Sequence, residues 1–175
     1  MCGACCKGFN EGDVYVYKED IERLLQFFHI KNRKSKLKKF TKKYLKIVET
    51  YFKLKGKYYK IQLLGFKFIG DDQHCEFLDL NNSCTVHEAR PFQCRAFPIG
   101  WNMLVENFEN FIDYSQKCPG LKDSLKNKGS LYSKQEVLKW ARIEYEMERK
   151  YYLEMKKNNF DIFKVYKFLP KKLRH

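Results

Sequence analysis

The sequence predicts an α+β fold that is mainly helical: a small, loop-rich cysteine-cluster metal domain with short strands and a C-terminal helical extension. Three observations predict it. Apolar residues recur at helical spacing in several segments, short segments of alternating character lie between them, and a turn-rich stretch over residues 70–119 holds four of the seven cysteines. We expect residues 1–125 to form the cysteine-cluster domain and residues 126–175 to form the helical extension.

The N-terminal third is predicted to contain one strand and two helices. Residues 13–17 alternate polar and large side chains, which indicates a short strand. A helix is expected over residues 18–28, with Glu19 and Asp20 in its first turn, where the helix dipole favours acidic groups. A second helix is expected over about residues 36–54, because one stripe of apolar residues runs through it and lysines occupy the other face.

The remaining elements follow from local signals. Residues 58–68 favour a strand or extended segment. Ser133 and Glu136 form a capping box that predicts a helix over residues 133–157, and a last short helix is expected over residues 161–168. Residues 122–130 are the only plausible linker.

The turn-rich stretch over residues 70–119 is long for a compact domain that has no other means of ordering it. A bound metal would order such a segment, because its ligation energy replaces apolar burial. The cysteines therefore become the main candidates for a functional site.

Seven cysteines are candidate metal ligands, and they fall into an N-terminal group and a later group. They are Cys2, Cys5, Cys6, Cys75, Cys84, Cys94 and Cys118. The spacing of Cys2 and Cys5 lets two sulfurs of one turn bind a single ion, whereas adjacent cysteines such as Cys5 and Cys6 do not easily point at the same ion. Zinc takes four ligands in a tetrahedron, and iron–sulfur clusters also take thiolates.

The number of sulfurs leaves several arrangements open: one four-thiolate site with spare cysteines, two sites that share a bridging thiolate, or two sites completed by histidine. His87 and His74 are the nearest histidines for that last arrangement. Thiolate sites accept both zinc and iron, so the sequence does not choose between them.

Charged residues close to the later cysteines are expected to support the ligands. Arg90 and Arg95 flank Cys94, where guanidinium groups would offset thiolate charge and donate to sulfur. Asp79 and Glu88 would hydrogen-bond those arginines and fix their orientation, as partners of metal ligands commonly do. An ordinary surface pair between Glu88 and Arg90 is the alternative.

The net charge and the distribution of apolar residues indicate which classes of partner to expect. The formal charge is +14, which suits nucleic acid, an anionic membrane surface or an acidic protein, although abundant lysine and asparagine with little alanine also suit an AT-rich coding sequence. No apolar run is long enough for a transmembrane helix and no N-terminal signal segment is present, so we expect a cytoplasmic protein without membrane contact. In such a reducing compartment clustered cysteines indicate metal ligands rather than disulfides.

The ordered string of motifs resembles the zinc- or iron-chelating cysteine-cluster family (YkgJ-like, with a C-x-x-C-x-x-C-C motif), which is related to flagellin lysine N-methylases. The resemblance covers roughly residues 1–121. It lies in Cys2-Gly-Ala-Cys5-Cys6, the helix start at Asp20-Ile21, Cys75-x-Phe77-Leu78-Asp79, Cys84-Thr-Val-x-Glu88-x-Arg90-Pro91-x-x-Cys94-Arg95-x-Phe97-Pro98, and Cys118-Pro-Gly. It implies zinc or iron as cofactor, including an iron–sulfur cluster as one form.

Two departures from the family pattern concern single ligands. The first cysteine of the family's opening motif would fall just before residue 1, so we expect either a reading frame that begins further upstream or one incomplete site. His87 occupies a position that the family usually fills with tyrosine, so no family role carries over to it.

Three functions follow from these features. The leading hypothesis is a metal-binding cysteine-cluster protein of unassigned role, structural or redox-active. The alternative is a protein-modifying enzyme similar to flagellin lysine N-methylase, with a protein substrate, although no Gly-rich loop for a nucleotide-like methyl donor is present. The third is a basic zinc protein that binds nucleic acid through the predicted lysine-rich helix.

Overall fold

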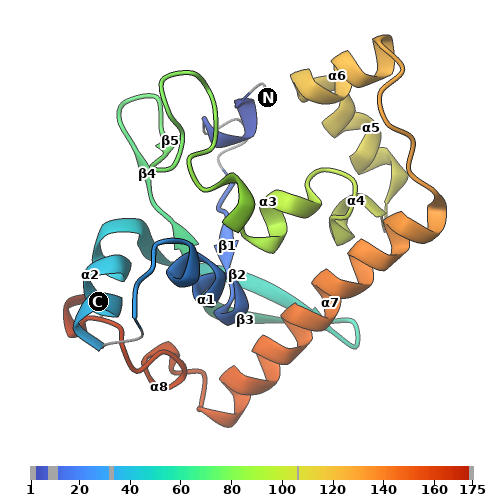
Figure 1. Ribbon diagram of the computed structural model, residues 1–175. Coiled ribbons are helices and arrows are strands. Elements are labelled where there is room, and N and C mark those ends of the chain that lie inside the picture. The colour runs from blue at the N-terminus through green and yellow to red at the C-terminus, as the bar shows by residue number, and fades with distance from the viewer. Residues whose placement is uncertain (1–2, 8–11, 32–33, 106, 174–175) are drawn as a thin grey trace.

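An antiparallel three-stranded sheet in the order β1–β3–β2 forms the centre of the computed structural model (Figure 1). The structure describes residues 3–7, 12–31, 34–105 and 107–173. Its strands are β1 (Tyr15–Val16), β2 (Leu45–Leu54), β3 (Lys57–Phe66), β4 (Phe68–Ile69) and β5 (His74–Cys75). Its helices are η1 (Ala4–Cys6), α1 (Lys18–Phe27), α2 (Lys34–Tyr44), η2 (His87–Ala89), α3 (Phe92–Ala96), α4 (Asn102–Val105), α5 (Phe108–Lys117), α6 (Pro119–Lys126), α7 (Lys134–Lys157), α8 (Ile162–Val165) and η3 (Lys171–Leu173). The predicted mainly helical α+β class is confirmed.

The long hairpin of β2 and β3 corrects the predicted helix over residues 36–54. Helix α2 ends at Tyr44, and every residue from Leu45 to Leu54 pairs with β3. The segment contains Ile47, Val48 and Thr50, whose branched side chains favour a strand. Its helical periodicity was misleading because the pairing partner lies further along the chain, beyond the reach of a local pattern.

A two-residue turn closes this hairpin. Lys55 and Gly56 have φ angles of 49° and 75°, and Leu54 pairs with Lys57 across them. Two successive positive φ angles are typical of the type I′ turn, whose twist matches that of paired strands. The turn therefore fixes the register of the whole hairpin.

The core takes side chains from both faces of the sheet, among them Leu63 on one face and Leu64 on the other, and packs them with helices α1, α7 and α8. Its most deeply buried side chains include Leu24, Leu45, Leu64, Met155 and Ile162. Tyr151 of α7 donates a hydrogen bond to the Gln62 carbonyl of β3 at 2.6 Å, and the rings of Tyr59 and Tyr152 lie 5.1 Å apart. Helix α7 is thus attached to the sheet by both polar and aromatic contacts.

Helix α7 begins as predicted, since Ser133 and Glu136 make a reciprocal capping box. The expected linker over residues 122–130 is wrong for residues 122–126, which belong to α6, whereas residues 127–130 lie between α6 and α7. The turn-rich stretch over residues 70–119 also contains helices α3, α4 and α5. Asn107 caps α5 by accepting from the Glu109 N–H at 2.9 Å, a local signal that the sequence reading missed.

No helix in the described part of the chain combines the length and apolar character needed to cross a membrane.

Helix α4 is fastened to α7 by a half-buried carboxylate. The Asn102 backbone N–H donates to Glu144 at 2.5 Å, and a Cβ at Gly100 would collide with the Cβ of Trp140. Burial raises the pKa of Glu144 to about 6, although the hydrogen bond from Asn102 opposes the shift. The close approach of α4 to α7 therefore keeps a carboxyl group in poorly solvated surroundings.

This raised pKa predicts a specific pH dependence. The folded protein binds the Glu144 proton more tightly than the unfolded chain does, so this group favours folding at low pH and loses that contribution as pH rises from about 4.5 to about 6. The difference amounts to at most about 2 kcal/mol. We expect Glu144→Gln to gain up to this much stability relative to wild type between pH 4 and pH 7, as measured by urea unfolding at several pH values.

Exposed Glu146 on the same helix provides the control. A constant difference in free energy of unfolding between Glu144→Gln and wild type at all pH values would contradict the assignment, as would an equal effect of Glu146→Gln.

Candidate metal centre

Six described cysteines from five separate places in the chain line one cleft of about 1370 Å³. They are Cys5 and Cys6 on η1, Cys75 on β5, Cys84 in a β-bridge with Leu78, Cys94 on α3, and buried Cys118 between α5 and α6. All six are free thiols. Cys2 lies outside the described residues.

The N-terminal turn is packed against the loop that carries Cys84. Gly3 has a φ of 64°, and a Cβ on it would come within 3.0 Å of the Asn82 Cβ and 3.1 Å of the Asn82 carbonyl oxygen. Only glycine accepts both this backbone conformation and this close approach easily. Figure 1 shows the turn beside the loops around β5, so Gly3 places Cys5 and Cys6 next to the later cysteines.

The loop between Cys75 and Cys84 is held by backbone and carboxylate hydrogen bonds. Asp79 accepts from the N–H groups of Asn81 and Ser83 at 2.9 and 2.8 Å. The Thr85 N–H donates to the Phe77 carbonyl at 2.8 Å. Asp79 therefore shapes the loop itself.

Phe77 attaches the same loop to the core. Its ring lies 4.7 Å from that of Tyr44, 5.1 Å from Phe66 and 6.0 Å from Phe28, measured between centroids. Aromatic contacts of this kind add to the free energy gained by burial. A side chain two residues after Cys75 thus fixes the position of that cysteine relative to the sheet.

Helix α3, which carries Cys94, is positioned by two side chains from outside the predicted site. Buried Asp20 accepts from the Phe92 N–H at 2.8 Å and from the Tyr17 N–H at 3.1 Å. It therefore joins the first turn of α1 to the first turn of α3. The local sequence indicated Asp20 only as part of a helix start.

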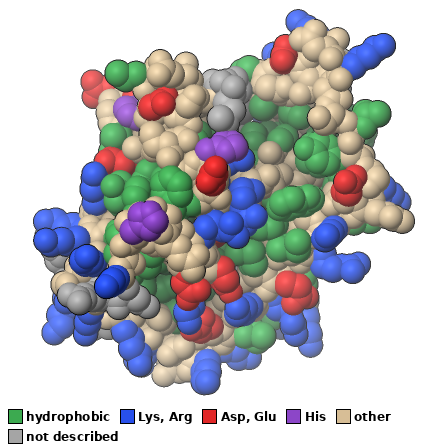
Figure 2. Space-filling model, in the orientation of Figure 1, with side chains coloured by type: hydrophobic (Ala, Val, Ile, Leu, Met, Phe, Trp, Pro, Cys, Tyr) green, Lys and Arg blue, Asp and Glu red, His purple; other side chains and the backbone are tan. Residues whose placement is uncertain are grey.

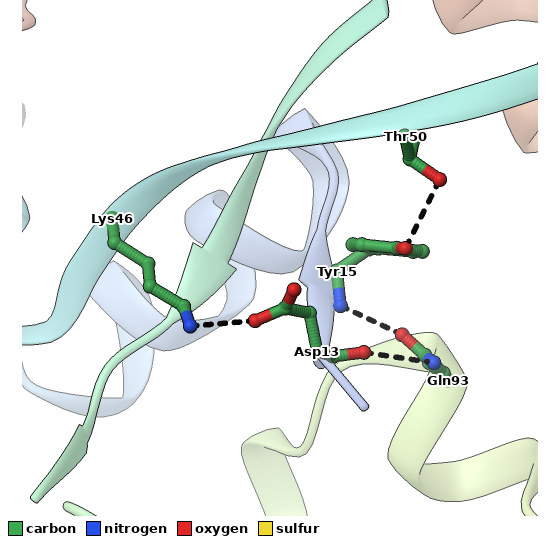
Figure 3. A network of polar contacts seen from close by, with 5 residues as sticks. All are labelled: Asp13, Tyr15, Lys46, Thr50 and Gln93. Atoms are coloured by element: carbon green, nitrogen blue, oxygen red, sulfur yellow. Dashed lines mark hydrogen bonds and ion pairs between the residues drawn. The ribbon is translucent and has the colours of Figure 1, made fainter. Parts of the chain in front are cut away.

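Gln93 makes the second attachment, to strand β1 (Figure 3). Its Oε1 accepts from the Tyr15 N–H at 2.7 Å, and its Nε2 donates to the Asp13 carbonyl at 3.3 Å. Lys46 forms an ion pair with Asp13 at 2.6 Å, and the Tyr15 hydroxyl donates to Thr50 at 3.1 Å. Nothing in the local sequence indicated this role, since the partners of Gln93 lie about eighty residues away.

The thiols influence one another electrostatically. Burial, with smaller contributions from the nearby Cys84 and Cys5, raises the pKa of Cys75 to about 11. Burial also raises the pKa of Cys84 and Cys94, and charges on neighbouring cysteines add to the shift. The protein alone thus favours neutral thiols, and a cation would have to supply the charge that stabilises several thiolates together.

Cys5 and Cys6 differ from the others. The Cys6 thiol hydrogen-bonds to the Cys5 sulfur, which lowers the pKa of Cys5 to about 7 and raises the pKa of Cys6. Cys5 is also exposed. Cys5 is therefore the most readily ionised thiol of this pair.

Arg90 contributes positive potential to the cleft, which its side chain lines. It acts to lower the pKa of Cys5, Cys84 and Cys94. Its Nε donates to the His87 carbonyl at 3.0 Å, and Arg95 Nε donates to the Arg90 carbonyl at 3.1 Å.

Asp79, Glu88 and the two histidines were also predicted to take part in the site. Among the described residues, no ion pair links Asp79 or Glu88 to either arginine. His87 is exposed on η2, and His74 Nδ1 lies 2.6 Å from Asp72 Oδ1. Neither histidine belongs to the described lining of the cleft.

The described cysteines line one cleft, but they are not arranged as a complete metal site. Within residues 3–7, 12–31, 34–105 and 107–173, no group of three or more Cys, His, Asp or Glu side chains is arranged so that it could hold a metal ion. The donor chemistry nevertheless fits zinc or iron, because free thiols converge from several segments and Arg90 faces them.

The opposite wall of the cleft is apolar and was not predicted. It is contributed by Phe97, Trp101, Phe111, Tyr114, Leu121, Val137 and Leu138. The rings of Phe97 and Trp101 lie 4.8 Å apart, and those of Trp101 and Tyr114 lie 5.8 Å apart. In Figure 2, hydrophobic side chains show at the surface between the N-terminal turn and the lobe formed by α5 and α6.

The double attachment of Asp20 predicts a large effect of its removal. Asp20→Ala leaves two backbone N–H groups without their acceptor, and we expect a loss of roughly 2–4 kcal/mol in free energy of unfolding. Urea unfolding of the reduced, metal-free protein measures this loss. Glu22→Ala, an exposed change on the same helix, should stay near wild type. Equal stabilities of the two variants would contradict the role given to Asp20.

The comparisons with known proteins agree with the donor chemistry. A family model named CxxCxxCC, whose description reads "Putative zinc- or iron-chelating domain", matches residues 1–119. Neither the curated proteins nor the solved structures gave a match. The matched region covers η1 to α5 and includes every cysteine of the cleft. The chain belongs to the CxxCxxCC family of zinc- or iron-chelating domains.

Proposed function

We propose that the protein binds zinc or iron through a cluster of cysteine thiolates that orders its N-terminal turn and central loops. The observation that carries the proposal is the convergence of Cys5, Cys6, Cys75, Cys84 and Cys94 on one cleft. Their mutual effects on pKa support a shared site. Cys2 and Cys118 complete the proposed ligand set.

The metal would have a structural consequence. The chain between β5 and α3 contains a single turn of 3-10 helix, and the N-terminal turn is attached to it mainly through Gly3 and Asn82. Phe77, Val86 and Ala89 hold the loops in the core, whereas η1 contains no buried residue, so ligation would supply free energy chiefly to the N-terminal turn. Arg90 would remain beside the thiolates and offset part of their charge.

Cys118 has a distinct place in this proposal. It is buried where α5 ends and α6 begins, and Figure 1 shows these two helices apart from the loops around β5. A metal bond to Cys118 would tie the lobe of α5 and α6 to the cysteine loops.

Zinc and an iron–sulfur cluster lead to different roles. Zinc has no redox chemistry and would act as a scaffold, whereas an iron–sulfur cluster held by the same thiolates would transfer electrons. We place the protein in the cytoplasm, where reduced thiols are available for either metal. Residues 126–175 would be an extension whose main helix packs on the sheet of the metal-binding region.

The first test is the metal content and the thiol reactivity of protein purified without oxygen. We expect near-stoichiometric zinc or iron, and fewer thiols that react with Ellman's reagent before chelation than after it. Cys94→Ser should reduce the bound metal strongly, because Cys94 interacts with Cys75, Cys5 and Cys84. Ser83→Ala, in the same loop as Cys84, provides a control that leaves every thiol in place.

Two results would contradict the proposal. One is protein with neither metal near stoichiometry whose folded state is unaffected by added zinc or iron(II). The other is full metal content in Cys94→Ser, which would remove that sulfur from the site.

A second function, a protein-modifying enzyme similar to flagellin lysine N-methylase, has one observation in its favour. The cysteines open directly onto a cleft whose opposite wall is rich in aromatic side chains. Apolar clefts with a few convergent polar groups are the usual form of a ligand site. A substrate side chain in this cleft would lie close to the thiol cluster.

This second function has a direct test. Methyl transfer requires that a methyl donor bind, so isothermal titration of metal-loaded protein with the donor should give saturable heat that Trp101→Ala reduces. Tyr132→Ala, at the rim of the cleft, provides the comparison. It should reduce the heat of binding less than Trp101→Ala does, because the Tyr132 side chain is half exposed. Absence of binding at millimolar concentrations of the donor would contradict this second function and leave metal binding as the proposed function.

A further inference from the structure

The outer face of the β2–β3 hairpin carries an alternating pattern of tyrosine and lysine. Strand register places Tyr51 opposite Lys60 and Lys53 opposite Tyr58. Side chains directly opposite in an antiparallel pair lie on the same face, so these four residues form one patch with tyrosines on one diagonal and lysines on the other. We call these four residues the hairpin patch.

The hairpin patch faces solvent. Tyr51 and Tyr58 are each 68% exposed, which is unusual for large aromatic side chains in a folded protein. The opposite face of the hairpin contains Tyr59 and Ile61 and packs on the core beneath α7. At this end of the hairpin only that other face contacts the core, so the hairpin patch contributes little burial to the fold, whereas further along the same face Leu45 and Leu64 are buried.

The distance between Tyr51 and Tyr58 suits the stacking of two successive bases. Diagonal neighbours across an antiparallel pair lie roughly 7–8 Å apart, so two exposed rings offer two adjacent stacking surfaces. Lys53 Nζ lies 6.0 Å from the centroid of the Tyr58 ring, which keeps a cation beside that surface. Rings flanked by cations are the usual means by which proteins bind unpaired nucleic acid strands.

The charge around the patch is mostly uncompensated. Lys60 forms an ion pair with Glu49 at 2.7 Å. Within the described part of the chain, no acidic partner is found for Lys53, or for Lys55 and Lys57 at the hairpin turn. Lys53 therefore lies on the same face as the rings, and Lys55 and Lys57 add positive charge for a phosphate backbone at the adjoining turn.

We propose that the hairpin patch, together with Lys55 and Lys57, binds single-stranded nucleic acid, with bases stacked on Tyr51 and Tyr58 and phosphates beside the free lysines. The patch uses no cysteine and lies on the hairpin, so this inference is independent of the metal proposal. The proposed site also differs from the lysine-rich face of α2. Among the described residues of α2, no exposed aromatic side chain accompanies the lysines.

An anionic membrane is the competing partner for a basic aromatic surface. The rings of the patch carry hydroxyl groups, and its four residues include no large aliphatic side chain of the kind that inserts among acyl chains. These features favour an unpaired nucleic acid strand over a lipid surface.

Fluorescence anisotropy with a labelled short oligothymidylate tests the ring contribution. Tyr51→Ala/Tyr58→Ala should weaken binding by roughly 5- to 100-fold or more, because alanine removes base stacking. Tyr51→Phe/Tyr58→Phe keeps both rings and should stay within a few-fold of wild type. Circular dichroism and thermal unfolding should show all four substitutions to be tolerated, since the side chains lie in solvent.

Two matched lysine variants test the charge contribution. Lys53→Gln/Lys55→Gln/Lys57→Gln should lower affinity and reduce the slope of log affinity against log salt by about 2. Lys36→Gln/Lys38→Gln/Lys39→Gln removes the same charge from exposed positions of α2, where Figure 2 shows a dense group of cationic side chains. The α2 variant should have the smaller effect, because the hairpin runs away from α2 (Figure 1).

Three outcomes would overturn the inference. The first is equal loss of affinity in the two lysine variants with no effect of the tyrosine changes, which indicates unspecific charge attraction. The second is equal affinity for duplex and single-stranded DNA. The third is binding to phosphatidylserine vesicles that depends on both tyrosines while oligonucleotide binding does not.

Discussion

The structure depends on one constraint: thiols carried by loops and short helices must face the same cleft although little regular structure surrounds them. Three contacts hold the thiol-bearing segments in this position. Gly3 packs on Asn82, Phe77 inserts among aromatic rings, and Asp20 links α1 to α3. Each contact joins a cysteine-bearing segment either to another such segment or to the core. The cleft is therefore formed by the fold, and a metal would complete what these contacts begin.

The charge balance of the cleft explains why a cation suits it. Burial raises the pKa of Cys75, Cys84 and Cys94, so the protein alone keeps these thiols neutral. Arg90 acts in the opposite direction but is a single cation beside several sulfurs. A divalent ion supplies more charge at shorter range than a guanidinium group, and thiolates are the form that binds it.

Sequence reasoning succeeded where the information was local. Helices α1 and α7 were predicted because apolar periodicity and the Ser133–Glu136 capping box lie within the elements themselves. Residues 45–54 were predicted as helix because their periodicity fits both structures, and only pairing with β3 decides between them. The cysteines were recognisable by type and spacing, whereas Asp20 and Gln93 act through bonds that span more than seventy residues. Such contacts depend on topology, which a local pattern does not contain.

X-ray absorption spectroscopy of protein purified without oxygen tests the central claim most directly, because it reports the atoms bound to the metal. The account predicts a first shell dominated by sulfur, at about 2.3 Å if the metal is zinc. A first shell of nitrogen and oxygen alone would contradict the claim that the converging cysteines hold the metal.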